Sequence, residues 1–261
     1  MKAAPFEYRA PQTVEEAVNA LGDAGEEGKV LAGGQSLVPM LAFRLARPAV
    51  VVDINRLEEI PGMTEIRVDG NAVRLGALAR QRAVERAGVP VIAEALSHVA
   101  HPGVRNRGTV VGSICHADAA AELCAVALAL DAQIEVRSAR GERSIPAVEL
   151  LLGPFATSLA ADELAVAARF TVAEGWRWRT LEVSRRAFDF ALCGVVAGVA
   201  PGRTWGRVAV FGAGPRAYRV DGPIEELPAR AVAAAEPATD IHADAGYRRH
   251  LVEVLSRRAL Q

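Results

Sequence analysis

Two adjacent glycines separate a short strand from a helix near the start of the chain, and they constrain the fold more than any other feature. Residues 29–32 predict a strand, and residues 37–45 are apolar at the spacing of a helix. Gly33 and Gly34 lie between them. Such a loop leaves backbone N–H groups at the positive end of a helix. It is therefore either a tight turn or a loop that binds an anion such as phosphate.

The segments around this loop predict a small α/β unit. Residues 6–9 alternate as a strand does, and a capping box at Thr13 opens a helix over 13–24. Residues 49–54 form a β-branched run that is typical of a buried strand. The order strand, helix, strand, helix, strand is that of an α/β fold.

A second glycine-containing loop occurs later in the chain. Residues 105–113 contain Gly108 and Gly112, end in a short β-branched strand edge at 109–111, and precede a helix predicted at 119–130. Glycine lets a phosphate approach the backbone closely. Two such loops suit the pyrophosphate of a dinucleotide, although each is also explained by a tight turn. On spacing alone, the chain is a candidate nucleotide-binding protein.

The rest of the sequence predicts mainly antiparallel strands. Two hairpins are expected at 65–75 and 133–145, and a strand at 163–172. We expect a domain boundary near Glu174 and Gly175. Beyond it the pattern predicts strands at 179–184, 194–200 and 207–212 and helices at 227–235 and 245–258.

Charge and cysteine content exclude several classes of function. The net charge is −1, so the chain lacks the basic field of a nucleic-acid-binding protein. The three cysteines form no C-x-x-C motif, so we expect no metal site from this chain alone. Glu122 and Asp131 bracket the longest apolar run, and the first residues lack a signal core. These features predict a soluble, cytoplasmic protein without a membrane partner.

Specific motifs resemble a known family. The segments LAGGQSLVPMLAFRLARPAVVVDINRL (31–57) and HPGVRNRGTVVGSICHADAAAELCAVALAL (101–130) closely resemble the FAD-binding medium subunit of the molybdenum hydroxylases. This family includes carbon monoxide dehydrogenase and the flavin domain of xanthine dehydrogenase. Shorter matches extend the resemblance over nearly the whole chain; they lie at 152–157, 162–164, 185–191, 240–242 and 247–251.

The resemblance implies an α+β (mixed α/β) fold. Residues 1–175 would form an FAD-binding domain of the vanillyl-alcohol-oxidase type, with subdomains at about 1–56 and 57–175. Residues 176–261 would form a small, shortened α+β domain of the medium-subunit type.

It also implies a set of cofactor-binding residues. The FAD pyrophosphate would lie between the two glycine loops, and Glu122 would lie near the ribityl chain. The implied residues are Leu31, Ala32, Gly33, Gly34, Gln35, Ser36, Leu37, Thr109, Val110, Val111, Gly112, Ser113 and Glu122. No catalytic side chain is predicted, because the flavin carries the chemistry.

The implied function is electron transfer within a heteromeric enzyme. Electrons would pass from the 2Fe–2S clusters of a small subunit, through FAD, to an external acceptor, while a large molybdopterin subunit oxidises the substrate. An alternative is a stand-alone FAD-dependent oxidase or dehydrogenase that acts on a small molecule in a biosynthetic pathway. A second alternative is a non-redox descendant that has lost FAD.

One substitution motivates the last alternative. Val111 stands where the family has a glycine, in T-V-V-G in place of T-I-G-G. We expect its methyl groups to lie where the backbone approaches the pyrophosphate.

Several nearby side chains have two interpretations. Arg105 and Arg107 either attract phosphates or cover the surface. Phe188 either covers a flavin face or packs in the core. His98 is expected to be structural, and Asp53 to cap the turn after its strand.

Overall fold

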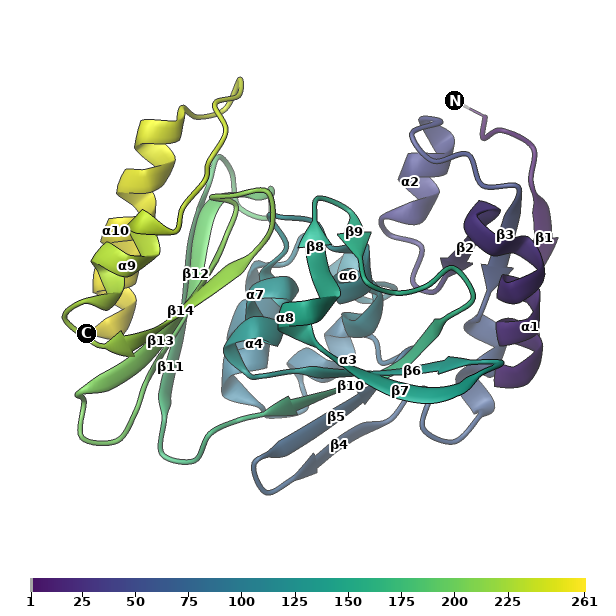
Figure 1. Ribbon diagram of the computed structural model, residues 1–261, viewed down its shortest axis with the longest axis horizontal. Coiled ribbons are helices and arrows are strands. Elements are labelled where there is room, and N and C mark those ends of the chain that lie inside the picture. The colour runs from purple at the N-terminus through teal and green to yellow at the C-terminus, as the bar shows by residue number, and fades with distance from the viewer. Residues whose placement is uncertain (1) are drawn as a thin grey trace.

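A computed structural model describes residues 2–261, which form four β-sheets and the helices that pack on them (Figure 1). The N-terminal sheet has the parallel order β1–β3–β2. Its strands and helices are β1 (Glu7–Arg9), α1 (Val14–Ala24), β2 (Gly28–Leu31), α2 (Leu37–Ala42) and β3 (Val50–Asp53), with short 3₁₀ turns η1 (Gly25–Glu27) and η2 (Asn55–Glu59). The predicted α/β unit is therefore confirmed, although α2 ends three residues early.

The second sheet is antiparallel, with the order β4–β5–β10–β6–β7. Its strands are β4 (Ile66–Asp69), β5 (Ala72–Gly76), β6 (Gln133–Ser138), β7 (Gly141–Pro146) and β10 (Leu164–Thr171). Both predicted hairpins and the predicted strand at 163–172 are confirmed.

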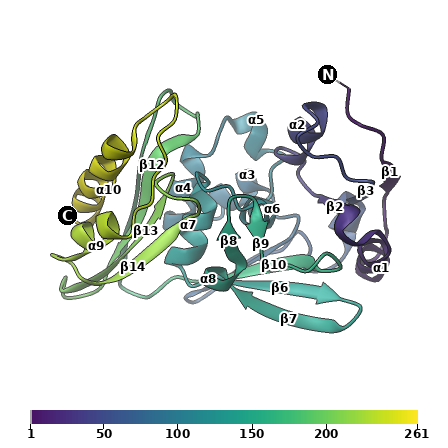
Figure 2. The same ribbon diagram turned by 45° about the horizontal axis from the view of Figure 1, so that its top comes forward.

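Helices fill the space between this sheet and the next. They are α3 (Gln81–Glu85), α4 (Pro90–His98), α5 (Pro102–Arg105), α6 (Val110–His116), α7 (Glu122–Ala129) and α8 (Ala147–Leu150). Every residue of α7 is buried, because sheets and helices surround it. A small hairpin of β8 (Leu151–Gly153) and β9 (Ala156–Thr157) lies beside α6 (Figure 2), where the Phe155 N–H donates to the Ala117 carbonyl at 3.0 Å.

The last sheet has the antiparallel order β11–β12–β13–β14. Its strands are β11 (Arg177–Ser184), β12 (Ala191–Val199), β13 (Trp205–Phe211) and β14 (Tyr218–Pro223). Helices α9 (Leu227–Ala233) and α10 (Ala245–Leu260) cover one face (Figure 1), while α4 and α7 pack on the other. All residues of β12 are buried, because both faces of the sheet are covered.

Two sequence predictions fail around the second glycine loop. Residues 109–111 were expected to form a strand edge, but α6 begins at Val110 because the Thr109 side chain accepts a hydrogen bond from the Gly112 N–H. The helix expected at 119–130 begins only at Glu122. Strand β14 was not predicted, because only its first four residues alternate and its sequence, YRVDGP, ends in the turn-forming pair Gly222 and Pro223.

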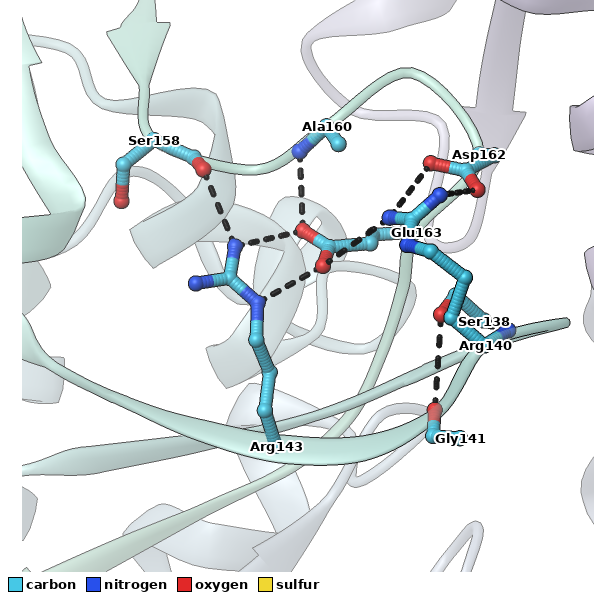
Figure 3. A network of polar contacts seen from close by, with 8 residues as sticks. All are labelled: Ser138, Arg140, Gly141, Arg143, Ser158, Ala160, Asp162 and Glu163. Carbon is cyan, nitrogen blue, oxygen red and sulfur yellow. Dashed lines mark hydrogen bonds and ion pairs between the residues drawn. The ribbon is translucent and has the colours of Figure 1, made fainter.

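An ion-pair network holds the segment between β9 and β10 (Figure 3). Arg143 on β7 makes two bonds of 2.7 Å to the carboxylate of Glu163, and Arg140 binds Asp162. Glu163 also accepts from the Ala160 N–H at 2.8 Å. Hydrogen bonding to Arg143 lowers the pKa of Glu163. The motif at 162–164 therefore has a structural role here: it ties the return from the β8–β9 hairpin to the β6–β7 hairpin.

Two further observations concern the chain as a whole. Among residues 2–261, no helix combines the length and apolar character that crossing a bilayer requires. The domain division at residue 175 stays a prediction. The chain passes there from β10 of the second sheet to β11 of the last.

Candidate functional site

The two glycine loops lie against each other. A Cβ built on Gly33 would be 2.4 Å from the carbonyl oxygen of Arg107 and 2.8 Å from the Cα of Gly108. Both distances are shorter than real Cβ contacts, so only glycine fits at this position. A Cβ on Gly112 would be 3.9 Å from the Cβ of Ala32, which brings the start of α6 next to the same loop. Segments 75 residues apart in the sequence thus form one surface.

The first loop presents a row of free backbone donors. None of the hydrogen bonds formed within residues 2–261 uses the N–H groups of residues 33–37. Gly34 has a φ of +75°, a left-handed conformation that glycine adopts without strain. This turn leads directly into α2. Five successive N–H groups are thereby available to an anionic acceptor.

A pocket of about 300 Å³ lies under this loop. The predicted residues Leu31, Ala32, Gly33, Gly34 and Gln35 line it, whereas Ser36 and Leu37 lie at the start of α2, outside the lining. The other lining residues are Val38, Pro39, Asp53, Asn55 and Arg107. Arg107 is exposed and lines this pocket, so both of its predicted roles remain predictions.

A hydrogen-bond network missed by sequence reasoning braces the pocket. The guanidinium of Arg80 donates to the carbonyl oxygen of Arg107 and to Oδ1 of Asn55, both at 2.8 Å. The Nδ2 of Asn55 donates to the Ala32 carbonyl oxygen at 2.8 Å. Arg80 therefore connects both loops. Burial, followed by the charge of Arg107, lowers the pKa of Arg80. Nothing in the sequence near Arg80 indicates this role.

The Asp53 carboxylate, which lines the pocket, already accepts hydrogen bonds from neighbouring residues. Asp53 accepts from the Asn55 N–H at 2.9 Å, as its predicted capping role requires, and from the Tyr8 hydroxyl at 2.5 Å. The hydrogen bond to Asp53 raises the pKa of Tyr8. Asp53 keeps its negative charge, and the free backbone donors of residues 33–37 and the cationic Arg107 lie around the same pocket. These donors suit an anionic group.

Residues 109–113 of the second loop do not bring side chains into this pocket. Thr109, Val110 and Val111 are buried, while Gly112 and Ser113 are half-buried. The hydroxyl oxygen of Thr109 is occupied by the Gly112 N–H at 3.1 Å. These residues do not line the 300 Å³ pocket, but the contact of Gly112 with Ala32 places the start of α6 at its side.

The prediction that the Val111 methyl groups lie where the backbone approaches the pyrophosphate is wrong. The Val111 side chain is 2% exposed and packs in the main hydrophobic core. Thr109 sets the start of α6, so the second helical residue points its side chain inward. The Val111 N–H has no acceptor within the described residues and remains at the open end of the helix. The methyl groups of Val111 are therefore in the core and not at the surface where the two loops meet.

Val111→Gly is therefore expected to weaken the fold without strengthening cofactor binding. Loss of a buried valine together with glycine in a helix costs about 2 to 4 kcal/mol. Chemical denaturation measures this loss, and a flavin titration measures affinity. The exposed Val148, changed to glycine, serves as control. Tighter flavin binding by Val111→Gly contradicts the structure.

The remaining predicted cofactor-binding residue, Glu122, lies on α7. It occupies the first turn of α7, is 8% exposed and does not line the 300 Å³ pocket. Burial raises its pKa to about 8, and the charges of Glu182 and Asp118 act in the same direction. At neutral pH its carboxyl group is therefore mainly protonated and acts as a hydrogen-bond donor as well as an acceptor.

Other candidate side chains have structural roles. Arg105 is buried and donates to the carbonyl oxygens of Val99 and Ala100 and to Glu85. It is thus neither a surface residue nor a phosphate ligand. Burial raises the pKa of Cys115 to about 12, so this thiol is no nucleophile at neutral pH.

Known proteins are similar to this chain in sequence and in fold. Residues 4–170 match the family described as "FAD binding domain in molybdopterin dehydrogenase". The chain is 38% identical to the 6-hydroxypseudooxynicotine dehydrogenase complex subunit alpha of Paenarthrobacter nicotinovorans over 283 residues, covering 100% of this chain and 95% of the relative. It is also 38% identical to the nicotine 6-hydroxylase medium subunit of the same organism, over 287 residues, with 100% and 98% covered.

A solved structure also has the same fold as this chain. Carbon monoxide dehydrogenase from Hydrogenophaga pseudoflava, in a form that lacks the Mo-pyranopterin moiety, superposes with a TM-score of 0.93 at 32% identity. The match covers 100% of this chain and 97% of that one. The fold, the matched domain and the relatives agree: this chain belongs to the FAD-binding family of the molybdopterin dehydrogenases and is an FAD-dependent oxidoreductase subunit.

Proposed function

We propose that the protein is the electron-transfer subunit of a heteromeric molybdenum hydroxylase. In this proposal, it takes electrons from the 2Fe–2S clusters of a small partner subunit and passes them to an external acceptor. A large molybdopterin subunit oxidises the substrate. The observation that carries the proposal is the donor-lined pocket where the two glycine loops meet. The relatives, which are medium subunits of such enzymes, support it.

The residues of the loops fit FAD. We propose that the free N–H groups of residues 33–37, together with the backbone at 111–113, hold the pyrophosphate, with Arg107 balancing its charge. The unoccupied donors of residues 33–37 suit a phosphate, and the missing Cβ at Gly33 lets the second loop lie against the first. Glu122 is proposed to hydrogen-bond the ribityl chain. Bound FAD supplies the redox chemistry by accepting and releasing electrons.

The chain's own residues are proposed to position the cofactor. Arg80 and Asn55 fix the spacing of the two loops, so the donors are in place before binding. All three cysteines are free thiols, and two of them, Cys124 and Cys193, are buried. Three thiols are fewer than one 2Fe–2S cluster requires. Clusters and molybdopterin are therefore proposed to come from partner chains, in the cytoplasm.

Co-expression with the neighbouring genes tests the assembly. We expect the tagged chain to purify with an iron–sulfur subunit and a molybdopterin subunit, and its flavin spectrum to bleach when the complex receives substrate. The isolated chain is expected to bind FAD but to leave it oxidised with the same substrate. Turnover by the isolated chain would favour the stand-alone oxidase or dehydrogenase instead. A purified chain without a flavin absorbance band, even after FAD is added, would favour the non-redox alternative.

A further inference from the structure

We propose that Arg248 on α10 is a positioning residue for the cofactor. It holds the ends of two strands of the last sheet in place, so that Gly212 fixes the turn from which Glu122 starts α7. Helices α10 and α7 lie on opposite faces of this sheet, so the effect must pass around the sheet end (Figure 1). The inference rests on the proposed contact of Glu122 with FAD. Arg248 itself does not line the cofactor pocket.

The guanidinium of Arg248 binds the ends of two strands. The residue is 7% exposed. Its Nη1 donates to the carbonyl oxygen of Leu192 at 2.5 Å, near the start of β12, and to that of Gly212 at 2.9 Å, just after β13. Its Nη2 donates to Oδ2 of Asp240 at 2.7 Å. One buried side chain thus connects α10, both strand ends and the loop that precedes α10.

The loop before α10 fixes the counter-charge of Arg248. Oδ1 of Asp240 accepts hydrogen bonds from the N–H groups of Ala243 at 3.0 Å and His242 at 2.8 Å. These two bonds, helped by Arg248, lower the pKa of Asp240 to about 2, so its carboxylate is ionised at neutral pH. A buried cation without a partner is costly, whereas this one has a partner in a fixed place. The guanidinium is therefore held in one orientation.

Gly212 connects the guanidinium to the turn before α7. Its N–H donates to the carbonyl oxygen of Ala119 at 2.8 Å, while its own carbonyl oxygen accepts from Arg248. Its φ is +75°, and a Cβ built there would be 3.0 Å from the carbonyl oxygen of Leu192. A side chain would be strained at this position, so glycine allows the close approach. Both backbone polar groups of one residue are thus engaged, and a shift of the strand end moves the turn.

The turn at 118–121 has few other restraints. Inside it, the Ala120 N–H donates to Oδ1 of Asp118 at 2.9 Å, and no side chain caps α7. Within residues 2–261, the Gly212 N–H makes the only hydrogen bond to this turn from outside α6, α7 and the turn itself. The apolar packing around α7 is non-directional, so this bond sets where its first turn lies. A binding group such as the Glu122 carboxyl must be placed to within about 0.5 Å.

Hydrogen exchange of the FAD-free chain tests the first step. Arg248→Met removes the donors and keeps the apolar stem. We expect the segment 118–122 and the N–H of Gly212 to exchange roughly tenfold faster than in the parent, because local opening becomes easier. Leu255→Ala is the matched control, since Leu255 is buried on the same helix but makes none of these hydrogen bonds. It is expected to destabilise the C-terminal helix and to leave exchange at 118–122 unchanged.

A double-mutant cycle on FAD affinity tests the second step. Arg248→Met is expected to weaken FAD binding roughly tenfold in the parent chain and less than about twofold in the Glu122→Ala chain, because the residue through which it acts is then missing. Fluorescence titration measures both affinities. Arg248→Lys guards against a folding defect, because it keeps the charge opposite Asp240. Its single donor group lacks the planar fork, so its affinity is expected to lie between those of the parent and Arg248→Met.

Three results would contradict the role of Arg248 and leave the proposed function intact. They are unchanged exchange at 118–122 in Arg248→Met, equal loss of FAD affinity with and without Glu122, and an equal loss in Leu255→Ala. The last two would mean that Arg248 only stabilises the domain. A different result, FAD binding by Glu122→Ala that equals the parent's, would instead refute the proposed ribityl contact, and the inference would fail with it.

Discussion

Changing Gly33 to alanine is expected to weaken FAD binding at least tenfold while leaving a folded protein. The new Cβ would be 2.4 Å from the Arg107 carbonyl oxygen, so the two loops must separate. That movement breaks the alignment of the free N–H groups with the start of α6. We expect FAD affinity to fall at least tenfold, which corresponds to about 1.4 kcal/mol or more. Flavin fluorescence titration measures the affinity. Overpacking is expected to cost about 1 to 3 kcal/mol of unfolding free energy.

Gly22→Ala is the matched control for this experiment. Gly22 lies in α1, and a Cβ there meets no atom within 4 Å. Alanine in a helix is favoured over glycine by about 1 kcal/mol, so this variant is expected to be slightly more stable and to bind FAD normally. If Gly33→Ala binds FAD like the parent, the contact between the loops is not needed for the cofactor. The proposed pyrophosphate site would then be wrong.

Local patterns in the sequence predicted most of the strands. The β4–β5 and β6–β7 hairpins follow from alternation around turn residues such as Gly70 and Gly141, both of which have positive φ. Strand β12 was predicted as well, though three residues short at its start. Its complete burial was not predictable, because it depends on α4 and α7 on one face and on α9 and α10 on the other.

The candidate site was predicted only as far as its backbone. The first loop was identified from its glycines, and five of its seven predicted residues line the pocket. The direction of the Val111 side chain was wrong, because it depends on where Thr109 starts α6, and one residue of shift turns a side chain by about 100°. Arg80 was missed because its partners lie 25 and 27 residues away along the chain. Such contacts exist only in the folded chain.

Because Glu122 is mainly protonated, its substitution by glutamine and its substitution by alanine are expected to affect FAD binding differently. Because burial keeps its carboxyl mainly protonated at pH 7, Glu122 resembles glutamine, which also offers a donor and an acceptor. Under the proposed ribityl contact, Glu122→Gln is expected to bind FAD nearly as well as the parent at pH 7. Glu122→Ala is expected to bind it more weakly.

The parent protein is expected to lose stability as the pH rises, and Glu122→Gln is expected to remove most of this loss. The folded protein holds this proton with a pKa of about 8, whereas the ordinary value is 4.5. The folded state therefore binds more protons than the unfolded chain between these values, and stability must fall as the pH rises from about 4.5 to 8. A difference of one in pKa between the folded and unfolded states corresponds to about 1.4 kcal/mol of unfolding free energy. The total loss of stability is therefore on the order of 3 to 5 kcal/mol.

Urea denaturation of the FAD-free chain between pH 5 and 9 measures this slope. We expect Glu122→Gln to unfold at higher urea than the parent at pH 9, and the two proteins to converge near pH 5. Glu182→Gln is expected to give a smaller change of the same sign, because burial raises the pKa of Glu182 only to about 7. Glu149→Gln, at an exposed site on α8, serves as control and should follow the parent curve. If parent and Glu122→Gln keep the same difference in stability at every pH, Glu122 is ionised in the folded protein. Its carboxylate would then need a cationic partner, and the described residues provide none.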